Sequence, residues 1–226
     1  MYDYFKRLSK EITESQKINR KILRHIINSF KGKTLDVGCG ELMTSLGLNK
    51  RNYLGIDFVP SKDTDIVGDI HKLPFDDESF DNCICNTVLE HVEDPEQVMK
   101  EIYRILKRNG KLLVSIPFLQ EYHPDPEDYR RFTPVGFKEF IEKKGFKVLK
   151  IYGDSGILNV LEYLSFGGFV RRIKLGSKKN FPLGYFYIVF LGFLFFLFKF
   201  FNLLFRNLQK DDSSFITMII VLAEKK

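Results

Sequence analysis

Two glycines at the end of a short apolar run are the residues best suited to hold a ligand through the backbone. The run 33–37 predicts a buried strand, and Gly38-Cys39-Gly40 follows it directly. Because glycine has no Cβ, a ligand can approach the chain closely at such a turn. A G-x-G sequence also occurs in ordinary strand-to-helix turns, so its function depends on the residues around it.

Two aspartates close the next two predicted strands. Asp57 ends the strand 52–57, nineteen residues after Gly38, where a carboxylate can accept hydrogen bonds from ribose hydroxyls. Asp69 ends the strand 65–69, where it could meet the amino group of an adenine. Three successive strand ends therefore describe an adenosine-binding crevice.

The elements that must position these residues alternate between strands and helices through residue 152. Such alternation predicts an α/β fold with a doubly wound, mostly parallel sheet of seven strands. Asp94-Pro95-Glu96-Gln97 has the residues of a capped helix start, and Gly110 is expected to end that helix as a left-handed cap. The further strands are predicted at 80–86, 111–116, 146–152 and 215–223, and the main helices at 5–30, 94–110 and 133–145.

Several motifs in a fixed order resemble one known family, over roughly residues 34–152. The matching segments are 35–40, 55–57, 68–75, 79–81, 88–92 and 94–114. The sequence is similar to class I S-adenosylmethionine-dependent methyltransferases of the type-11 domain group. The rival use of such a crevice, a nicotinamide dehydrogenase, normally has the fuller G-x-G-x-x-G, which is absent here.

The resemblance implies a Rossmann-like methyltransferase fold with S-adenosyl-L-methionine as cofactor. It implies that Asp36 and Gly38 lie against the methionine part, that Asp57 binds the ribose, and that Asp69 lies near the adenine. Leu42 stands where the family usually has a third glycine. The cofactor-binding set expected in this chain is Asp36, Gly38, Gly40, Asp57, Asp69, Ile70 and Asn86.

Chemistry on the methyl acceptor is expected from residues that follow the fourth and fifth strands. A base helps when the acceptor is a hydroxyl, because a protonated alcohol is a poor nucleophile. His123 and His91 are the catalytic candidates, although His91 could equally be a helix-boundary residue bonded to backbone. No metal site is expected, since Cys83 and Cys85 lack supporting histidines. The substrate-binding candidates, from the polar loop 121–131, are Tyr122, Tyr129, Arg130 and Arg131.

Composition separates the chain into an acidic centre and two basic segments. The 226 residues carry a net charge of +6, and ten of the 23 phenylalanines fall between residues 181 and 205. Residues 171–210 hold eight Lys/Arg and no Asp/Glu, while residues 34–154 hold sixteen basic and twenty-two acidic side chains. The predicted domains are therefore a basic helix (1–33), a methyltransferase domain (34–154 and 213–226) and a hydrophobic helical insert (155–212).

The insert predicts contact with a membrane surface. Residues 181–198 carry no charge, and basic residues flank them on both sides. Both flanks should then stay on the cytoplasmic side, so an interfacial helix or a re-entrant hairpin is favoured over a single crossing. Burial of the insert in a homodimer is the alternative. The expected location is cytoplasmic, peripheral or monotopic at the inner face of the membrane.

These features predict a membrane-associated transferase that methylates a lipid-linked, glycan-related or small-molecule acceptor by in-line transfer. Two other functions are compatible with the sequence: an RNA methyltransferase, or a non-catalytic membrane-associated scaffold with an adenosine-binding fold. The basic residues lie among apolar ones, so no nucleic-acid partner is expected.

Overall fold

The computed structural model describes residues 13–49, 51–124, 126–154, 156–176, 182–205 and 215–226. The chain divides into two compact units. The sheet unit comprises Ile22–Phe118, Tyr122–Tyr152 and Met218–Lys226. The hairpin unit comprises Leu119–Glu121, Gly153–Thr217 and the N-terminal stretch that ends at Lys21.

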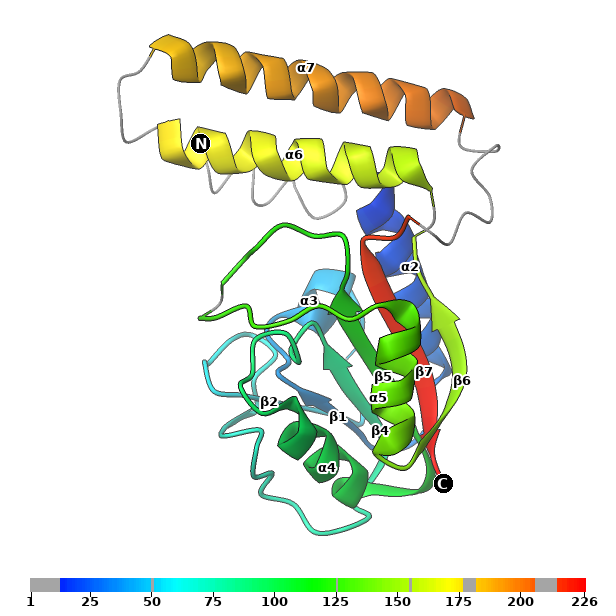
Figure 1. The fold of residues 1–226 in the computed structure, drawn as a ribbon. Coiled ribbons are helices and arrows are strands. Elements are labelled where there is room, and N and C mark those ends of the chain that lie inside the picture. Colours follow the sequence, from blue (N-terminus) through cyan, green and yellow to red (C-terminus); the bar gives the residue numbers. More distant parts are fainter. Residues whose placement is uncertain (1–12, 50, 125, 155, 177–181, 206–214) are drawn as a thin grey trace. The chain divides into compact units, whose positions relative to one another are not determined.

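Seven strands form one sheet in the order β3-β2-β1-β4-β5-β7-β6 (Figure 1). The strands β1 to β5 are parallel, whereas β7 runs antiparallel to both β5 and β6. The expected α/β fold with a mostly parallel sheet of seven strands is thus confirmed. The strands are β1 (Thr34–Val37), β2 (Tyr53–Asp57), β3 (Ile66–Val67), β4 (Phe80–Asn86), β5 (Leu106–Pro117), β6 (Phe146–Tyr152) and β7 (Met218–Lys225).

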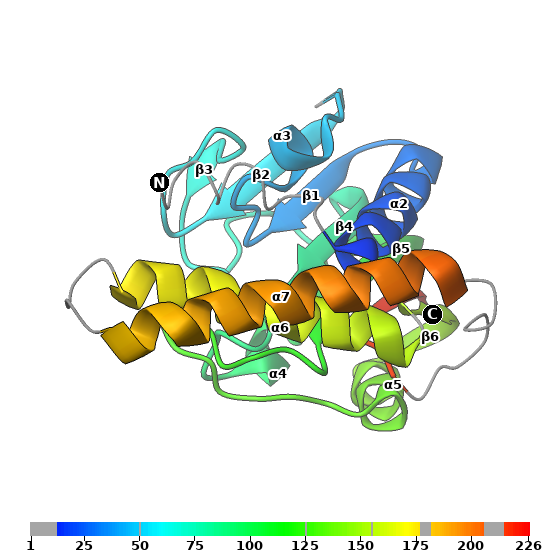
Figure 2. The same cartoon turned by 90° about the horizontal axis from the view of Figure 1, so that it is seen from above.

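Helices cover both faces of the sheet, with α2 and α3 on one face and α4 and α5 on the other (Figure 2). Apolar side chains of α2 and α3, among them Leu23, Ile26 and Met43, pack against Ile84 of β4 and Leu113 of β5. This packing fixes the strand ends that carry the predicted site. The helices are α2 (Glu14–Ser29), α3 (Leu42–Leu46), α4 (Pro95–Ile105) and α5 (Pro134–Lys143).

The predicted start of α4 is confirmed, but its predicted end is wrong. Asp94 accepts a hydrogen bond from the backbone N–H of Gln97 at 3.0 Å, and Pro95 occupies the first turn. The helix ends at Ile105, and β5 begins at once with Leu106. The left-handed position belongs to Asn109, with φ 61°, and Gly110 lies inside the strand. Asparagine tolerates this conformation through its short polar side chain, so the turn does not need glycine there.

The hairpin unit contains two long helices, α6 (Ile157–Gly176) and α7 (Pro182–Phe205), which lie side by side in both views (Figures 1 and 2). Phe166 of α6 and Phe195 of α7 contact each other, with ring centroids 5.2 Å apart. The buried Asn202 of α7 donates to Glu162 at 2.8 Å and to Asn159 at 2.6 Å, both on α6. The hairpin is therefore held by a polar cluster as well as by ring packing.

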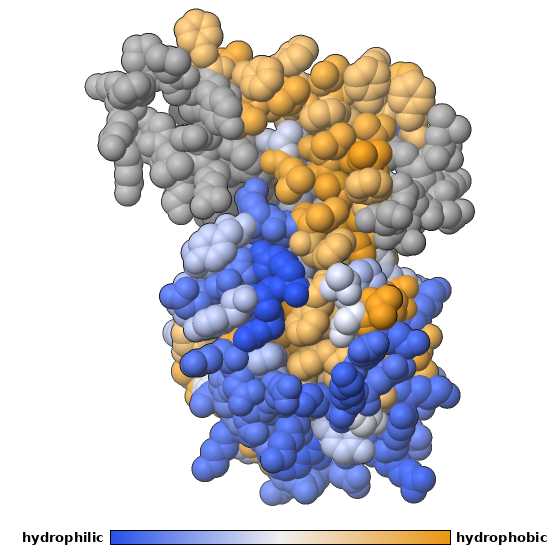
Figure 3. Space-filling model, in the orientation of Figure 1, coloured by the Kyte–Doolittle hydropathy of each residue, from blue (hydrophilic) through white to orange (hydrophobic). Residues whose placement is uncertain are grey.

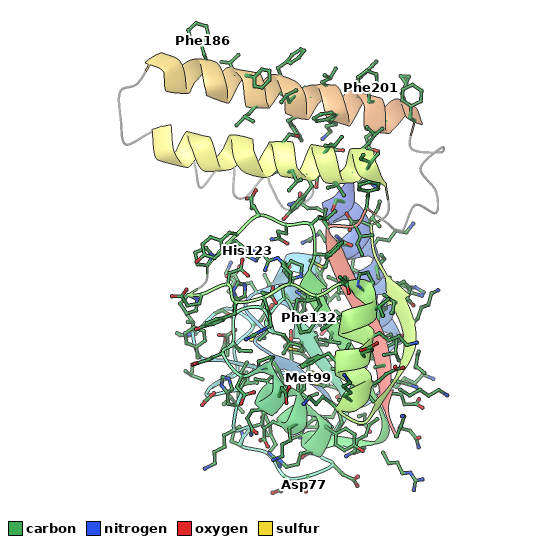
Figure 4. All side chains as sticks on the ribbon, in the orientation of Figure 1. Asp77, Met99, His123, Phe132, Phe186 and Phe201 are labelled. Carbon is green, nitrogen blue, oxygen red and sulfur yellow. The ribbon has the colours of Figure 1, made fainter. Side chains whose placement is uncertain are left out.

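Exposed apolar side chains lie along the described part of α7, which is coloured orange in Figure 3. Figure 4 shows Phe186 on the side of α7 that points away from α6. Among the described residues, none of the helices combines the length and the hydropathy that a membrane span requires. The members of this face that are more than half exposed, here called the α7 face, are Phe186, Val189, Phe190, Phe193, Phe196, Phe200, Leu203 and Leu204.

Candidate active site

The glycine turn after β1 has the conformation that its sequence predicts. Gly38 and Gly40 have φ values of 69° and 47°, in the region that favours glycine. A Cβ on Gly38 would lie 2.4 Å from Cγ2 of Val88, whereas a Cβ on Gly40 would meet nothing within 4 Å. Gly38 is thus required for packing, whereas the turn leaves open space beside Gly40.

Asp36 lies in β1, two residues before Gly38. Its carboxyl group is buried, and one of its oxygens has no hydrogen-bond partner among the described residues. Tyr53 donates its hydroxyl hydrogen to Oδ2 of Asp36 at 2.7 Å, while Oδ1 accepts no hydrogen bond from any described residue. Burial raises the pKa of Asp36 to about 8. A buried polar atom without a partner is rare in proteins, so this oxygen points to a ligand group.

Asp57, at the end of β2, braces the glycine turn. Its Oδ2 accepts the N–H of Gly40 at 2.9 Å, and its Oδ1 accepts the N–H of Val59 at 3.0 Å. Leu42, in place of the usual third glycine, starts α3, and its side chain packs against the core. The turn therefore closes without that glycine, since the side chain of Leu42 points away from the open space.

Asp69 and Ile70 follow β3. Asp69 is exposed, and its Oδ1 accepts hydrogen bonds from the backbone N–H of His71 at 2.9 Å and from its ring Nδ1 at 2.8 Å. These bonds hold the pKa of Asp69 below its usual value. His71 thereby orients a charged carboxylate, and Ile70 is half-buried beside it.

Asn86 ends β4 at a strained turn. Its Oδ1 accepts from the hydroxyl of Ser115 at 2.8 Å. The next residue, Thr87, has a φ of 54°, which is unusual for a β-branched side chain. Its N–H donates to the carbonyl of Ser115 at 3.1 Å, so the neighbouring strand stabilises this conformation. Strain of this kind concentrates at functional sites.

The two candidate histidines lie together. The rings of His91 and His123 contact each other edge to face, with centroids 5.1 Å apart. His91 Nδ1 lies 2.6 Å from the carbonyl oxygen of Glu127, so this nitrogen carries the hydrogen in the neutral ring and Nε2 is the acceptor. The chain thus brings both predicted catalytic histidines to one place.

The two candidate arginines are both engaged by protein groups. Arg130 donates to the carbonyl oxygens of Leu89 at 2.7 Å, of Glu93 at 2.9 Å and of Val92. Arg130 therefore ties its loop to the chain after β4, and its expected contact with the substrate stays a prediction.

Arg131 forms a two-point ion pair with Asp128, and one of its nitrogens lies 3.4 Å from Nδ1 of His123. The hydrogen bond from Arg131 lowers the pKa of Asp128 to about 2. Tyr122 and Tyr129 are about half exposed, so their rings are accessible to an acceptor.

Sequence reasoning missed Glu90, which lies between the predicted strand and His91. Its side chain is fully buried, and neither carboxylate oxygen accepts a hydrogen bond within the described part of the chain. Burial raises its pKa to about 8. Glu90 lies within the family-matching segment 88–92, but the residue type alone does not distinguish it from an exposed acid.

Comparisons with known proteins agree with this fold and with a methyltransferase domain. Residues 35–114 match the type-11 methyltransferase domain family. An uncharacterised protein of Methanocaldococcus jannaschii is 31% identical over 137 residues, covering 53% of this chain and 67% of that protein. A demethylmenaquinone methyltransferase of Staphylococcus epidermidis is 28% identical over 205 residues, covering 74% and 85%.

Among solved structures, a Burkholderia thailandensis 1,6-didemethyltoxoflavin-N1-methyltransferase with bound S-adenosylhomocysteine superposes with a TM-score of 0.58. It is 11% identical and covers all of this chain and 84% of its own, so it supports the fold alone. Alignments with three curated relatives span 67%, 41% and 62% of their lengths. The chain belongs to the class I S-adenosylmethionine-dependent methyltransferases.

The residues present fit the cofactor of this family, S-adenosyl-L-methionine. The open space at Gly40 and the unpartnered Oδ1 of Asp36 provide room and a polar contact. Asp57 ends β2, and Asp69 lies two residues after the end of β3 rather than at the predicted strand end. The individual contacts of the seven cofactor residues stay predictions.

Proposed function

We propose that this methyltransferase acts at a membrane surface on a lipid-linked or otherwise apolar acceptor. The cofactor half of the proposal is supported by the turn at Gly38 and Gly40 with the buried Asp36 beneath it. The membrane half is supported by the α7 face, a row of exposed aromatic and aliphatic side chains on one side of a long helix.

Charge near the α7 face favours a lipid surface over a dry protein partner. The segment 171–210 carries eight basic and no acidic residues. Apolar side chains that enter the headgroup region, flanked by Lys and Arg, are typical of helices that lie in an anionic interface. The curated S. epidermidis relative, named for the acceptor demethylmenaquinone, adds support for an apolar acceptor.

The chain's own residues position the reactants. Bound S-adenosyl-L-methionine supplies an electrophilic methyl group, so the protein mainly aligns the acceptor and excludes water. Arg130 fixes the loop 122–131 against the chain after β4, which gives the acceptor side of the crevice a rigid wall. A hydroxyl acceptor must also lose its proton, and Nε2 of His91 or the ring of His123 is the proposed proton acceptor.

Transfer activity tests the enzymatic part. Full-length protein is assayed with labelled S-adenosyl-L-methionine and demethylmenaquinone in anionic vesicles, beside calorimetry with the cofactor alone. We expect His123→Ala to lower turnover about 100-fold or more while cofactor affinity stays unchanged. Unchanged turnover of His123→Ala and His91→Ala would remove both from proton transfer, and no cofactor binding by the wild type would favour the scaffold function.

Vesicle flotation tests the membrane part. The double variant Phe193→Ser/Phe200→Ser removes two rings from the α7 face and is expected to weaken binding to anionic vesicles. Val135→Ser is the matched control, because Val135 is 68% exposed on α5 and lies outside the α7 face. If the double variant floats with the vesicles as well as Val135→Ser does, the proposal is contradicted. If the double variant changes from dimer to monomer without loss of flotation, the α7 face is a homodimer interface.

A further inference from the structure

Glu90, His91 and His123 form a cluster with the composition of a metal site. One side-chain ligand atom from each residue lies within 4.8 Å of those of the other two. His91 Nε2 and Glu90 Oε1 are 3.7 Å apart. Two ligands of one tetrahedral zinc ion lie about 3.4 Å apart, at metal–ligand distances of about 2.1 Å. Small side-chain movements would therefore bring the three groups around a single ion.

The carboxylate of Glu90 is buried and lacks a hydrogen-bond partner among the described residues. Its side chain has 0% exposure, and neither oxygen accepts a hydrogen bond from the described residues. A buried carboxyl without a partner is costly, and it is offset either by protonation or by a cation. The nearest imidazole nitrogen, on His91, lies too far from Glu90 to satisfy it by a hydrogen bond.

Surrounding groups already orient the ligands. The contact of His91 Nδ1 with the carbonyl of Glu127 fixes the ring so that Nε2 is the free acceptor. A backbone carbonyl in this position is the usual partner of a histidine that binds metal. The N–H of Tyr129 donates to the carbonyl of Glu90 at 2.8 Å, so the loop that carries His123 is also held against Glu90.

The two arginines near the cluster are already engaged by other protein groups. Arg131 lies close to His123 but is paired with Asp128, whose carboxylate neutralises it. Arg130 directs its guanidinium to backbone carbonyls. Asp125 lies outside the described residues. Glu90 is thus the remaining carboxylate among the described residues of the cluster.

We propose that Glu90, His91 and His123 bind one divalent transition-metal ion of the zinc class. Two imidazole nitrogens and one carboxylate favour zinc or a similar ion over magnesium, which prefers oxygen ligands. Three protein ligands would leave a position open, typical of catalytic rather than structural zinc. A nitrogen that binds metal cannot also accept a proton, so an ion there would replace the two histidines as the group that activates an acceptor hydroxyl. It would do so by lowering the pKa of that hydroxyl, a role that rests on the proposed function.

Metal titration tests the site without any methyl acceptor. Full-length protein is stripped with a chelator and titrated with Zn²⁺ by calorimetry and with Co²⁺ by absorption spectroscopy. We expect one ion per chain and a cobalt spectrum of nitrogen and oxygen ligands without a thiolate charge-transfer band. Glu90→Gln, His91→Ala and His123→Ala should each weaken Zn²⁺ binding at least about 100-fold.

The control is His25→Ala, which removes an exposed histidine of α2 and should bind Zn²⁺ as the wild type does. Calorimetry with S-adenosyl-L-methionine shows that each variant is folded, and it separates failure of the metal site from failure of the methyltransferase proposal. The proposal is overturned if the wild type does not bind Zn²⁺, or if His25→Ala loses as much Zn²⁺ affinity as the three ligand variants. A thiolate band in the cobalt spectrum would also overturn it.

Discussion

At the scale of single residues, the buried carboxyl of Asp36 makes stability depend on pH. Burial raises the pKa of Asp36 in the folded state from the usual 3.8 to about 8, so the folded state holds the proton more tightly. The free energy of unfolding should then fall as pH rises from about 4 to about 8, by at most about 1.4 kcal/mol per pH unit. After burial, the hydrogen bond from Tyr53 lowers the pKa of Asp36, and the negative charges of Asp63 and Asp57 raise it.

The slope is measured by urea unfolding at a series of pH values between pH 5 and pH 8, spaced by about one pH unit. Asp36→Asn should show a shallower decline than the wild type, although Glu90 keeps a contribution of the same sign. The exposed Asp76→Asn is the control and should keep the wild-type slope. Parallel profiles for all three proteins contradict the prediction.

The two glycines of the turn should respond differently to alanine. Gly40→Ala should cost about 1–2 kcal/mol of stability, from its left-handed backbone alone. Gly38→Ala should cost more, because its methyl group would overlap Val88. Both variants should lose cofactor affinity in calorimetry.

A second change separates the two causes of destabilisation. Val88→Ala should recover part of the lost stability in Gly38→Ala and none in Gly40→Ala, as measured by urea unfolding. If the two backgrounds respond equally to Val88→Ala, the contact between Gly38 and Val88 does not explain the difference.

At the scale of elements, one side chain holds the loop 122–131 in place. Arg130→Ala removes the hydrogen bonds to three carbonyls, each worth about 1.5–3 kcal/mol for a charged donor. Limited proteolysis within the loop should then be about tenfold faster or more. Cofactor affinity should not change, and Arg108→Ala, an exposed arginine of β5, should leave cleavage at the wild-type rate. Cleavage of Arg130→Ala at that same rate would assign the loop's rigidity to its other contacts.

Local sequence signals predicted those elements whose boundaries depend on local chemistry. β6 spans Phe146–Tyr152 as expected, and the Asp94 cap and the two helical arms of the insert are present. The end of α4 was wrong because an asparagine took the turn expected of Gly110. The burial of Glu90 was not predictable, since it depends on a loop some forty residues away in the sequence.

At the scale of the whole molecule, charge and apolar surface are segregated along the chain. Binding to anionic vesicles should therefore weaken as salt rises from about 0.1 M to about 1 M, where the Debye length falls from about 10 Å to about 3 Å. Part of the binding should persist, because burial of the α7 face is not screened by salt. Flotation across a salt series measures both parts.

The same salt series distinguishes a lipid surface from RNA. Single-stranded RNA at about 0.1 M salt should show no binding in fluorescence anisotropy, where a nucleic-acid enzyme would bind in a strongly salt-dependent way. Salt-sensitive RNA binding without flotation would favour the RNA methyltransferase function.

The position of β7 between β5 and β6 also sets an order of assembly during translation. Within the described sheet β6 pairs with β7 alone, and β7 is synthesised after α6 and α7. Until then β5 keeps an open edge, and β6 has no neighbour in the sheet. Open edges of apolar strands promote association between chains, so the nascent protein is most exposed to aggregation while its insert is being made. A ribosome that stalls within the insert would release a chain in which only the five paired strands β1 to β5 can form the sheet. The seven-stranded sheet can form only after the insert has been synthesised.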